Sequence, residues 1–219
     1  MKIAVIPIDN RPICYDLIQD VLSIDKNIEL FMPKIEYLGG LTTQSNTEEL
    51  FNFIEGLSDI DYLIVSLDTI AYGGLVSSRR CSDTFDEIKS RMEYFKKLCS
   101  SRAKKILAFS SVMRISNNNI NEEEKEYWAQ WGKRIFDWSY YLHKTEKEKS
   151  YNCVYNIVPS EILNDYLETR KRNFDINKTY LNWAKEGFFD TLIFSKDDCA
   201  EYGLNVKEAQ ELEEIITKE

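Results

Sequence analysis

The sequence predicts an α/β fold built on a mostly parallel sheet of about five strands, with helices on both faces and a helical insertion between the fourth and fifth strands. Short apolar runs rich in β-branched residues alternate with segments in which apolar residues recur at helical spacing. Such alternation is typical of parallel strands joined by right-handed helical crossovers. A third observation is that each apolar run stops at polar residues, which the fold places at one edge of the sheet.

The first half of the chain predicts two crossovers. Residues 3–8 form a continuous apolar run that ends at a polar loop, as a buried strand does. Apolar residues at helical spacing then predict a helix over 13–22, and a second strand follows over 28–32. After a glycine pair, a helix opens near residue 47, with two acids in its first turn, and runs to 57. The run 62–67 is expected to be the third strand.

The second half continues the alternation. Thr84 and Glu87 have the spacing of a capping box, which predicts the start of a helix that runs to about Cys99. Residues 106–109 predict the fourth strand. A fifth strand is expected over 191–194, followed by a last helix over 206–216.

Between these strands, residues 121–188 have the character of a helical insertion into one α/β domain of residues 1–219. A long aromatic-rich helix is expected from about residue 122 through Trp138, and its tryptophans favour a core role. Residues 151–158 favour helix over strand. Further helices are expected after Pro159 and over 176–185.

Composition excludes several classes of function. The net charge of −9 disfavours binding to a phosphate backbone, so no nucleic-acid partner is expected. The apolar stretches fall far short of the roughly 20 residues that span a bilayer, and the N-terminus lacks the pattern of a signal peptide. Five widely spaced cysteines suggest neither a disulfide framework nor a zinc site. We therefore expect a soluble, cytoplasmic protein with a small-molecule substrate; the oligomeric state is open.

Charged side chains gather at the predicted carboxyl ends of the strands, where ligands of α/β proteins bind. Carboxylates beside arginines have pKa values that move apart, as general acid and base catalysis requires. The same oxygens would also suit Mg²⁺ or Ca²⁺, so a divalent metal stays an alternative. The candidate catalytic acids are Asp9, Asp68, Asp197 and Asp198.

Each of these residues also has a structural interpretation. An Asp after a strand is commonly a cap or turn former. Gly73 and Gly74 allow either close approach to a ligand or a plain turn. Arg170 and Arg172 fit C-terminal helix capping as well as an anion clamp. His143, the single histidine, is expected at the solvated surface, which disfavours a serine triad or a histidine metal site.

Six segments resemble a bacterial family known as domain of unknown function 4127. They are IPIDNRP (6–12), LGGL (38–41), SLDTIAYGGLVSSR (66–79), MRIS (113–116), DYLETRKRNFDIN (165–177) and SKDDCAEYGLN (195–205). The resemblance implies a match to the N-terminal part of longer members, so the chain would be a short form or a fragment. Lys196 departs from the family pattern, which more often has Gln there.

The family motifs mark most of the strand-end positions, and the resemblance implies no reaction. Our leading hypothesis is a hydrolase of a carbohydrate or similar polar metabolite, because glycosidic cleavage needs two carboxyl groups and no imidazole. Alternatives are a non-catalytic module that binds a sugar or anion, and a structural half that needs a missing C-terminal domain. The residues expected to bind the substrate are Asn10, Arg11, Tyr72, Gly73, Gly74, Arg79, Arg114, Arg170, Arg172, Asn173 and Tyr202.

Overall fold

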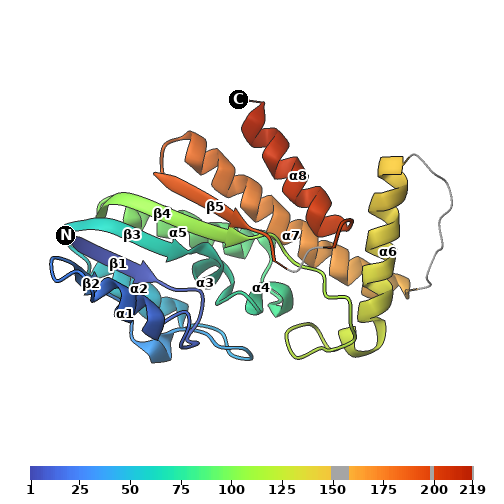
Figure 1. Ribbon diagram of the computed structural model, residues 1–219, viewed down its shortest axis with the longest axis horizontal. Coiled ribbons are helices and arrows are strands. Elements are labelled where there is room, and N and C mark those ends of the chain that lie inside the picture. Colours follow the sequence, from blue (N-terminus) through green and yellow to red (C-terminus); the bar gives the residue numbers. More distant parts are fainter. Residues whose placement is uncertain (149–157, 198–199, 219) are drawn as a thin grey trace. The chain divides into compact units, whose positions relative to one another are not determined.

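The computed structural model describes residues 1–148, 158–197 and 200–218 (Figure 1). The chain forms two compact units. Unit 1 comprises Met1–Ser111 and Thr179–Phe194, and unit 2 comprises Val112–Lys178 and Ser195–Glu219. Of the segment 151–158, for which helix was predicted, residues 151–157 lie outside the described residues. One α/β domain with an insertion over 121–188 stays a prediction.

A five-stranded parallel sheet organises the fold, in the order β2-β1-β3-β4-β5, and confirms the predicted fold class. All five predicted strands are present, and the largest differences are a longer fourth strand and a shorter second strand. Helices α6 and α7 lie between β4 and β5 along the chain, as the sequence indicates. The strands are β1 (Lys2–Ile6), β2 (Glu29–Phe31), β3 (Ile60–Ser66), β4 (Ala103–Ser111) and β5 (Thr191–Ser195).

The inner strands carry the core of the sheet. In the register of β1 and β3, Ile3 lies beside Tyr62 and Ile6 beside Val65. Residues 3–6 of β1 are all buried, which is why they form a continuous apolar run rather than an alternating one. On β5, which lies at an edge of the sheet, Ile193 is exposed. These buried inner strands hold the carboxyl ends of the sheet, and the loops that follow them, in place within unit 1.

Three helices of unit 1 begin at a polar side-chain cap, provided by Asn46, Ser66 and Thr84. Thr84 accepts a hydrogen bond from the Glu87 backbone N–H and receives the Glu87 carboxylate on its own N–H, so the predicted capping box is confirmed. Helix α1 buries none of its residues, and the apolar side chains Leu17 and Val21 are exposed. These helices are α1 (Asp16–Leu22), η1 (Ile35–Tyr37), α2 (Thr47–Glu55), α3 (Leu67–Tyr72), α4 (Ser77–Arg80) and α5 (Phe85–Cys99).

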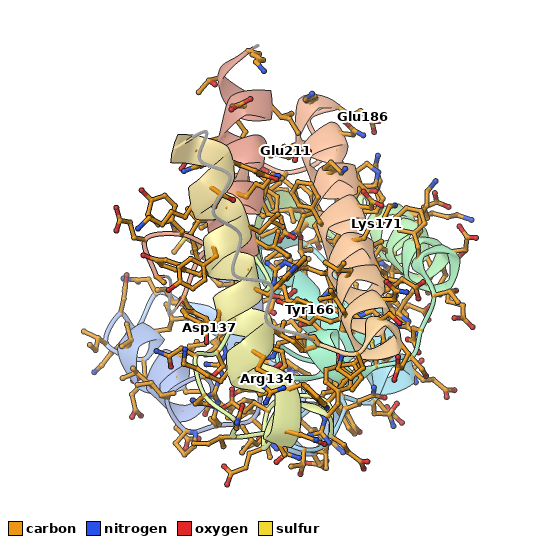
Figure 2. All side chains as sticks on the ribbon, turned by 90° about the vertical axis from the view of Figure 1, so that its right-hand side faces the viewer. Arg134, Asp137, Tyr166, Lys171, Glu186 and Glu211 are labelled. Atoms are coloured by element: carbon orange, nitrogen blue, oxygen red, sulfur yellow. The ribbon has the colours of Figure 1, made fainter. Side chains whose placement is uncertain are left out.

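Unit 2 contains α6 (Trp128–Glu148), most of α7 (Ser160–Lys185) and α8 (Leu204–Thr217). Its core joins Trp128 and Ile135 of α6, Tyr166 of α7, and residues Met113 and Ile115 that follow β4. The Trp128 and Tyr166 rings lie 5.7 Å apart, and Figure 2 shows Tyr166 between the two helices. The predicted core role of the aromatic stripe is thus correct for Trp128.

Two predictions for this region were wrong. Helix α6 begins at Trp128 rather than near residue 122, because residues 122–125 form turns. Helix α7 is continuous, whereas two helices were expected after Pro159 and over 176–185. The apolar pattern lapses in the middle of α7 because Arg170 and Asn173 are buried there in place of apolar residues. No helix in the described part of the chain has the length and apolarity needed to cross a membrane.

Candidate functional site

Asp9 lies in the loop that follows β1 and forms a closed ion pair with Arg11. Its carboxylate is buried and accepts hydrogen bonds from the Arg11 backbone N–H at 3.0 Å and from Arg11 Nε at 2.8 Å. The Arg11 side chain is 47% exposed. The next residue, Asn10, donates its backbone N–H to the Gly39 carbonyl. The β1 loop is thereby attached to the loop that carries the first glycine pair.

Two glycines allow the loops of unit 1 to meet backbone to backbone. A Cβ on Gly39 would lie 2.4 Å from the Gly73 carbonyl oxygen, which no side chain tolerates. Gly73 itself has φ +85°, a conformation that favours glycine. The neighbouring Thr69 hydroxyl donates to the Pro7 carbonyl at 2.8 Å. Gly73 therefore serves the junction of three loops, whereas the sequence suggested approach to a ligand or a turn.

Asp68 is the most perturbed carboxyl group of unit 1. It lies in the first turn of α3 and is 2% exposed. Its Oδ2 accepts the Ser111 backbone N–H at 2.9 Å, and its Oδ1 accepts the Ser110 hydroxyl at 3.4 Å. Burial raises the pKa of Asp68 to about 6, although the Ser111 and Ser110 hydrogen bonds and the Arg79 charge act in the opposite direction.

Two further buried groups interact electrostatically with Asp68. Arg79 is 3% exposed on the short helix α4. Tyr180, near the end of α7 and within unit 1, is fully buried, and burial raises its pKa well above the ordinary value. The Tyr180 hydroxyl has no hydrogen-bond partner among the described residues, and it interacts with Tyr72 and Asp68. We name these residues the Asp68 cluster: Asp68, Tyr72, Arg79, Ser110, Ser111 and Tyr180.

Tyr180 was not predicted as a site residue. It falls at the helical spacing of an ordinary core aromatic, and nothing in its neighbourhood in the sequence relates it to Asp68. Ser110 and Ser111 directly follow the predicted fourth strand in the sequence, yet only the register of β3 and β4, with Ser66 beside Phe109, shows that they reach Asp68. Tertiary register, rather than local pattern, assembles the cluster.

In unit 2, Arg170 is a fully engaged structural residue. Its Nε and one terminal nitrogen bind the two carboxylate oxygens of Glu208 at 2.7 Å each. It also donates to the Tyr166 hydroxyl at 2.9 Å and to the Met113 carbonyl at 2.6 Å. The residue lies in the middle of α7, so the prediction of a helix end was wrong. Arg170 links α7 to α8 and to the segment after β4.

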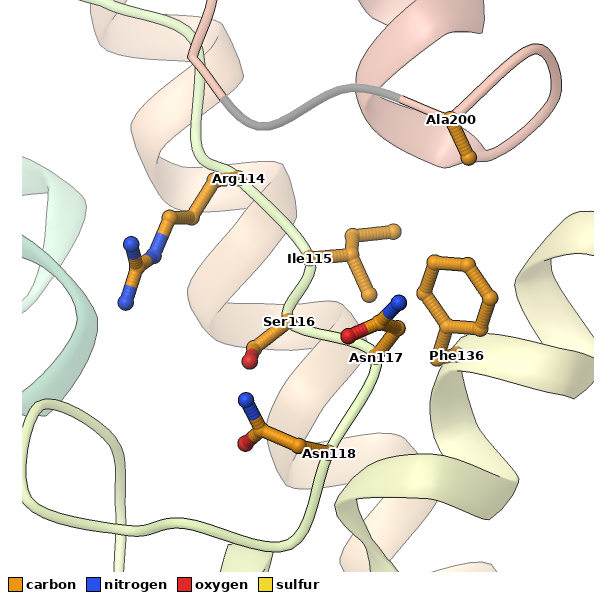
Figure 3. A pocket seen from close by; sticks show the side chains of 7 residues that line it. All are labelled: Arg114, Ile115, Ser116, Asn117, Asn118, Phe136 and Ala200. Atoms are coloured by element: carbon orange, nitrogen blue, oxygen red, sulfur yellow. The ribbon is translucent and has the colours of Figure 1, made fainter.

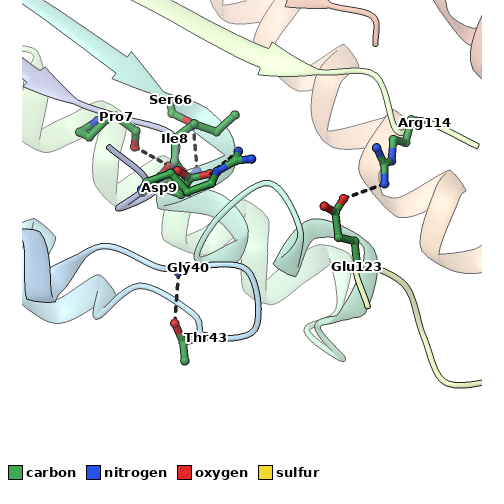
Figure 4. A network of polar contacts seen from close by, with 10 residues as sticks. Pro7, Ile8, Asp9, Gly40, Thr43, Ser66, Arg114 and Glu123 are labelled. Carbon is green, nitrogen blue, oxygen red and sulfur yellow. Dashed lines mark hydrogen bonds and ion pairs between the residues drawn. The ribbon is translucent and has the colours of Figure 1, made fainter. Parts of the chain in front are cut away.

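The other predicted residues of unit 2 lie in separate contacts. Arg172 donates to the Asn173 side-chain oxygen at 2.9 and 3.0 Å. Arg114 pairs with Glu123 at 2.6 Å, as Figure 4 also shows. The Tyr202 ring lies 5.4 Å from the ring of Tyr140. Asp197 follows β5, and Asp198 lies outside the described residues.

His143 is buried, not at the solvated surface as predicted. It is 2% exposed, and its Nδ1 accepts the Gly203 backbone N–H at 3.1 Å. One turn earlier on α6, the Ser139 hydroxyl accepts the Leu204 N–H at 2.8 Å. The two side chains cap the start of α8 from a neighbouring helix, which its own sequence, with glycine at the cap position, does not do. Burial lowers the pKa of His143.

The predicted residues thus divide between the units. The loop that carries Asp9, Asn10 and Arg11 lies together with the glycine loops. The Asp68 cluster brings Tyr72 and Arg79 together with Asp68. The described part of the chain holds no group of three or more His, Cys, Asp or Glu side chains that could bind a metal ion. The residues in unit 2 are Arg114, Arg170, Arg172, Asn173, Asp197 and Tyr202.

Comparison with known proteins identifies the family of the chain but shows no function. No curated protein and no solved structure matches the chain. A family model described as protein of unknown function (DUF4127) matches residues 3–219, which is nearly the whole chain. This extent agrees with the motifs that run through both units. The protein therefore belongs to the DUF4127 family.

Proposed function

We propose that the protein is a hydrolase of a carbohydrate or a similar polar metabolite, with Asp68 as the group that donates and accepts the proton. The observation that carries the proposal is the environment of Asp68. A general acid works best when its pKa lies near the working pH, and burial raises the pKa of this carboxyl group to about 6. Near neutral pH, an appreciable fraction of Asp68 then holds a proton.

The donors around Asp68 favour a group that changes charge. The Ser111 N–H and the Ser110 hydroxyl are neutral, so they stabilise the carboxylate only in part, and the nearby Arg79 adds a positive charge. An orienting hydrogen bond and one cation, within a site that excludes water, suit a carboxyl group that alternates between acid and base.

Glycoside cleavage also needs a second carboxylate. Asp9 is the candidate within unit 1, where Arg11 binds and orients it and the Arg11 side chain is 47% exposed. Asp197 and Asp198 stay candidates on the sequence alone.

The test is turnover of a panel of nitrophenyl glycosides and sugar esters by the full chain and by Asp68→Asn. Asparagine keeps the shape of Asp68 and can still accept the Ser111 N–H through its amide oxygen, but it cannot exchange a proton. We expect Asp68→Asn to reduce kcat at least about 100-fold, the usual contribution of a general acid. Asp61→Asn, which changes a partly exposed residue of β3, is the matched control and should keep full activity.

Three outcomes bear on the proposal. Unchanged turnover in Asp68→Asn, with circular dichroism like that of the unaltered chain, would exclude Asp68. Saturable binding of a panel member without any turnover would replace the hydrolase by a binding module. Loss of turnover in Asp9→Asn, with Asp197→Asn still active, would identify Asp9 as the second carboxylate.

A further inference from the structure

Unit 2 contains a pocket that the Asp68 cluster does not use. It has a volume of about 510 Å³ and is lined by the continuous segment 114–118 together with Phe136 of α6 and Ala200 (Figure 3). Pockets that hold small molecules typically measure roughly 300–1,000 Å³. The space is therefore sufficient for a ligand of the size of one or two sugar rings.

The wall of the pocket is built against α6 through a glycine. A Cβ on Gly132 would lie 2.5 Å from the Asn118 carbonyl oxygen and 2.4 Å from Trp128 Nε1, so only glycine lets this loop approach the helix. The Asn119 side chain accepts the Lys133 backbone N–H at 2.8 Å and fastens the same loop to the same turn of α6. These contacts hold the pocket wall in place before any ligand binds, which lowers the entropic cost of binding.

The charge at the pocket is balanced. Arg114 pairs with Glu123 at 2.6 Å, and its Nε lies 3.8 Å from the buried Glu124 carboxylate. An anionic ligand would have to displace Glu123 from the guanidinium and would face the Glu124 charge as well. Neutral ligands encounter neither cost, so the electrostatics favour an uncharged molecule.

The remaining side chains offer neutral hydrogen-bonding groups and one ring. Asn118 Oδ1 accepts the Ile120 N–H at 2.9 Å, which fixes the orientation of its amide and leaves the NH₂ group to donate elsewhere. Asn117 is exposed and makes no side-chain hydrogen bond to the described residues, and Figure 3 shows the Ser116 hydroxyl beside the Asn118 amide. Figure 3 shows the half-buried Phe136 ring beside Asn117.

We propose that this pocket binds a neutral polyhydroxylated ring, a monosaccharide or one unit of a longer saccharide. The two amides and the Ser116 hydroxyl pair with sugar hydroxyls, and Phe136 packs against the apolar C–H face of the ring. The inference goes beyond the proposed function, since it rests on unit 2 alone and requires no chemistry at Asp68.

The test uses ¹H–¹⁵N NMR titration to measure binding of D-glucose, D-galactose, D-mannose and N-acetylglucosamine to the full chain. Glucose 6-phosphate and inorganic phosphate serve as anionic probes. We expect saturable binding of at least one neutral sugar and a loss of affinity of about tenfold or more in the double variant Asn117→Ala/Asn118→Ala, because it removes two hydrogen-bonding groups. Asn164→Ala, an exposed asparagine of α7 outside the pocket, is the matched control and should bind normally.

The proposal fails if no neutral sugar binds, if the double variant binds as well as the control, or if only the phosphate probes bind. Because both substituted asparagines are exposed, the double variant should fold, and its NMR spectrum checks this directly. Asp68→Asn separates the two proposals. If sugar still binds to Asp68→Asn, the pocket is supported whether or not turnover is found. If Asp68→Asn abolishes sugar binding and the double variant retains it, the pocket proposal is overturned.

Discussion

Asp68 in unit 1 and Arg170 in unit 2 are both buried ionisable side chains, and their surroundings differ in one decisive respect. Arg170 faces a full counter-charge, since Glu208 binds it through two hydrogen bonds of 2.7 Å and two neutral acceptors complete its contacts. Asp68 accepts the Ser111 N–H at 2.9 Å and the Ser110 hydroxyl at 3.4 Å, and its hydrogen bonds together with the Arg79 charge do not offset its burial, which raises its pKa. The two side chains are thus buried to a similar degree, but the charge of Arg170 is compensated more fully than the charge of Asp68.

The difference separates a structural role from a chemical one. A fully compensated buried charge stays ionised at every physiological pH and fixes the elements that it joins. An incompletely compensated one titrates near neutrality, as the pKa of about 6 for Asp68 indicates. Burial alone therefore does not identify a functional residue. The comparison can be tested by removing each charge in turn.

The largest effect is expected for Arg170→Met. The substitution leaves the Glu208 carboxylate, whose side chain is 15% exposed, without its partner and should lower the free energy of unfolding by about 3–5 kcal/mol. Urea denaturation at pH 7 measures it. Adding Glu208→Leu should recover most of the loss, because an apolar pair replaces the ion pair.

Lys171→Met is the matched control for Arg170→Met. Lys171 neighbours Arg170 on α7, is 78% exposed and pairs only at the surface with Asp175, so its loss should change stability by less than about 0.5 kcal/mol. Figure 2 labels it on the outer side of the helix. A similar loss in both variants would contradict the structural role assigned to Arg170.

A smaller, pH-dependent effect is expected for Asp68→Asn. Because the folded pKa of about 6 exceeds the ordinary 3.8, the folded protein holds a proton that the unfolded chain has lost between these two pH values. The contribution of Asp68 to stability therefore falls as pH rises through this window, by up to about 3 kcal/mol in total, and stays low above it. The asparagine variant lacks this fall.

The measurement compares urea denaturation of the unaltered chain and of Asp68→Asn at several values between pH 4 and pH 7. The stability of the unaltered chain relative to the variant should decrease steadily with rising pH. A constant difference would show that Asp68 does not titrate in this range, and the comparison with Arg170 would lose its basis.

The smallest effect concerns His143, a third buried group, which is neutral rather than charged. Its Nδ1 accepts the Gly203 N–H, so protonation of Nδ1 would place a second N–H donor against the Gly203 N–H. Burial also lowers the pKa of His143. Because it is the single histidine, its imidazole ¹H NMR signals report it without overlap. The titration midpoint should lie below 6.5, and stability should decline as pH falls below that value. A midpoint above 6.5 would contradict the capping arrangement.

Local patterns predicted the sheet well and the site in part. The apolar run that became β1 and the capping box at Thr84 depend on neighbours in the sequence, and both were identified correctly. Asp68 was selected because it follows an apolar run, although it proved to be in the first turn of α3. Its burial and its Ser111 partner depend on strand pairing, which no local pattern contains.

The errors have the same origin. His143 lies among lysines and glutamates and looked solvated, but its side chain turns toward Gly203, sixty residues further along the chain. Arg170 and Asn173 interrupt the apolar pattern of α7 only because distant partners satisfy them. Buried polar residues are therefore the positions at which sequence periodicity misleads, and here they include the groups of greatest interest.

The division of the sheet-bearing unit into two stretches of chain has a consequence for folding. Strands β1 to β4 are complete by Ser111, whereas residues 112–178 intervene before the chain returns to supply Tyr180 and most of β5. Closing so long a loop costs entropy, so this return should be a late event during refolding and synthesis. Until it occurs, β4 remains an open edge that can pair with another chain, and the burial of Asp68 awaits the same step.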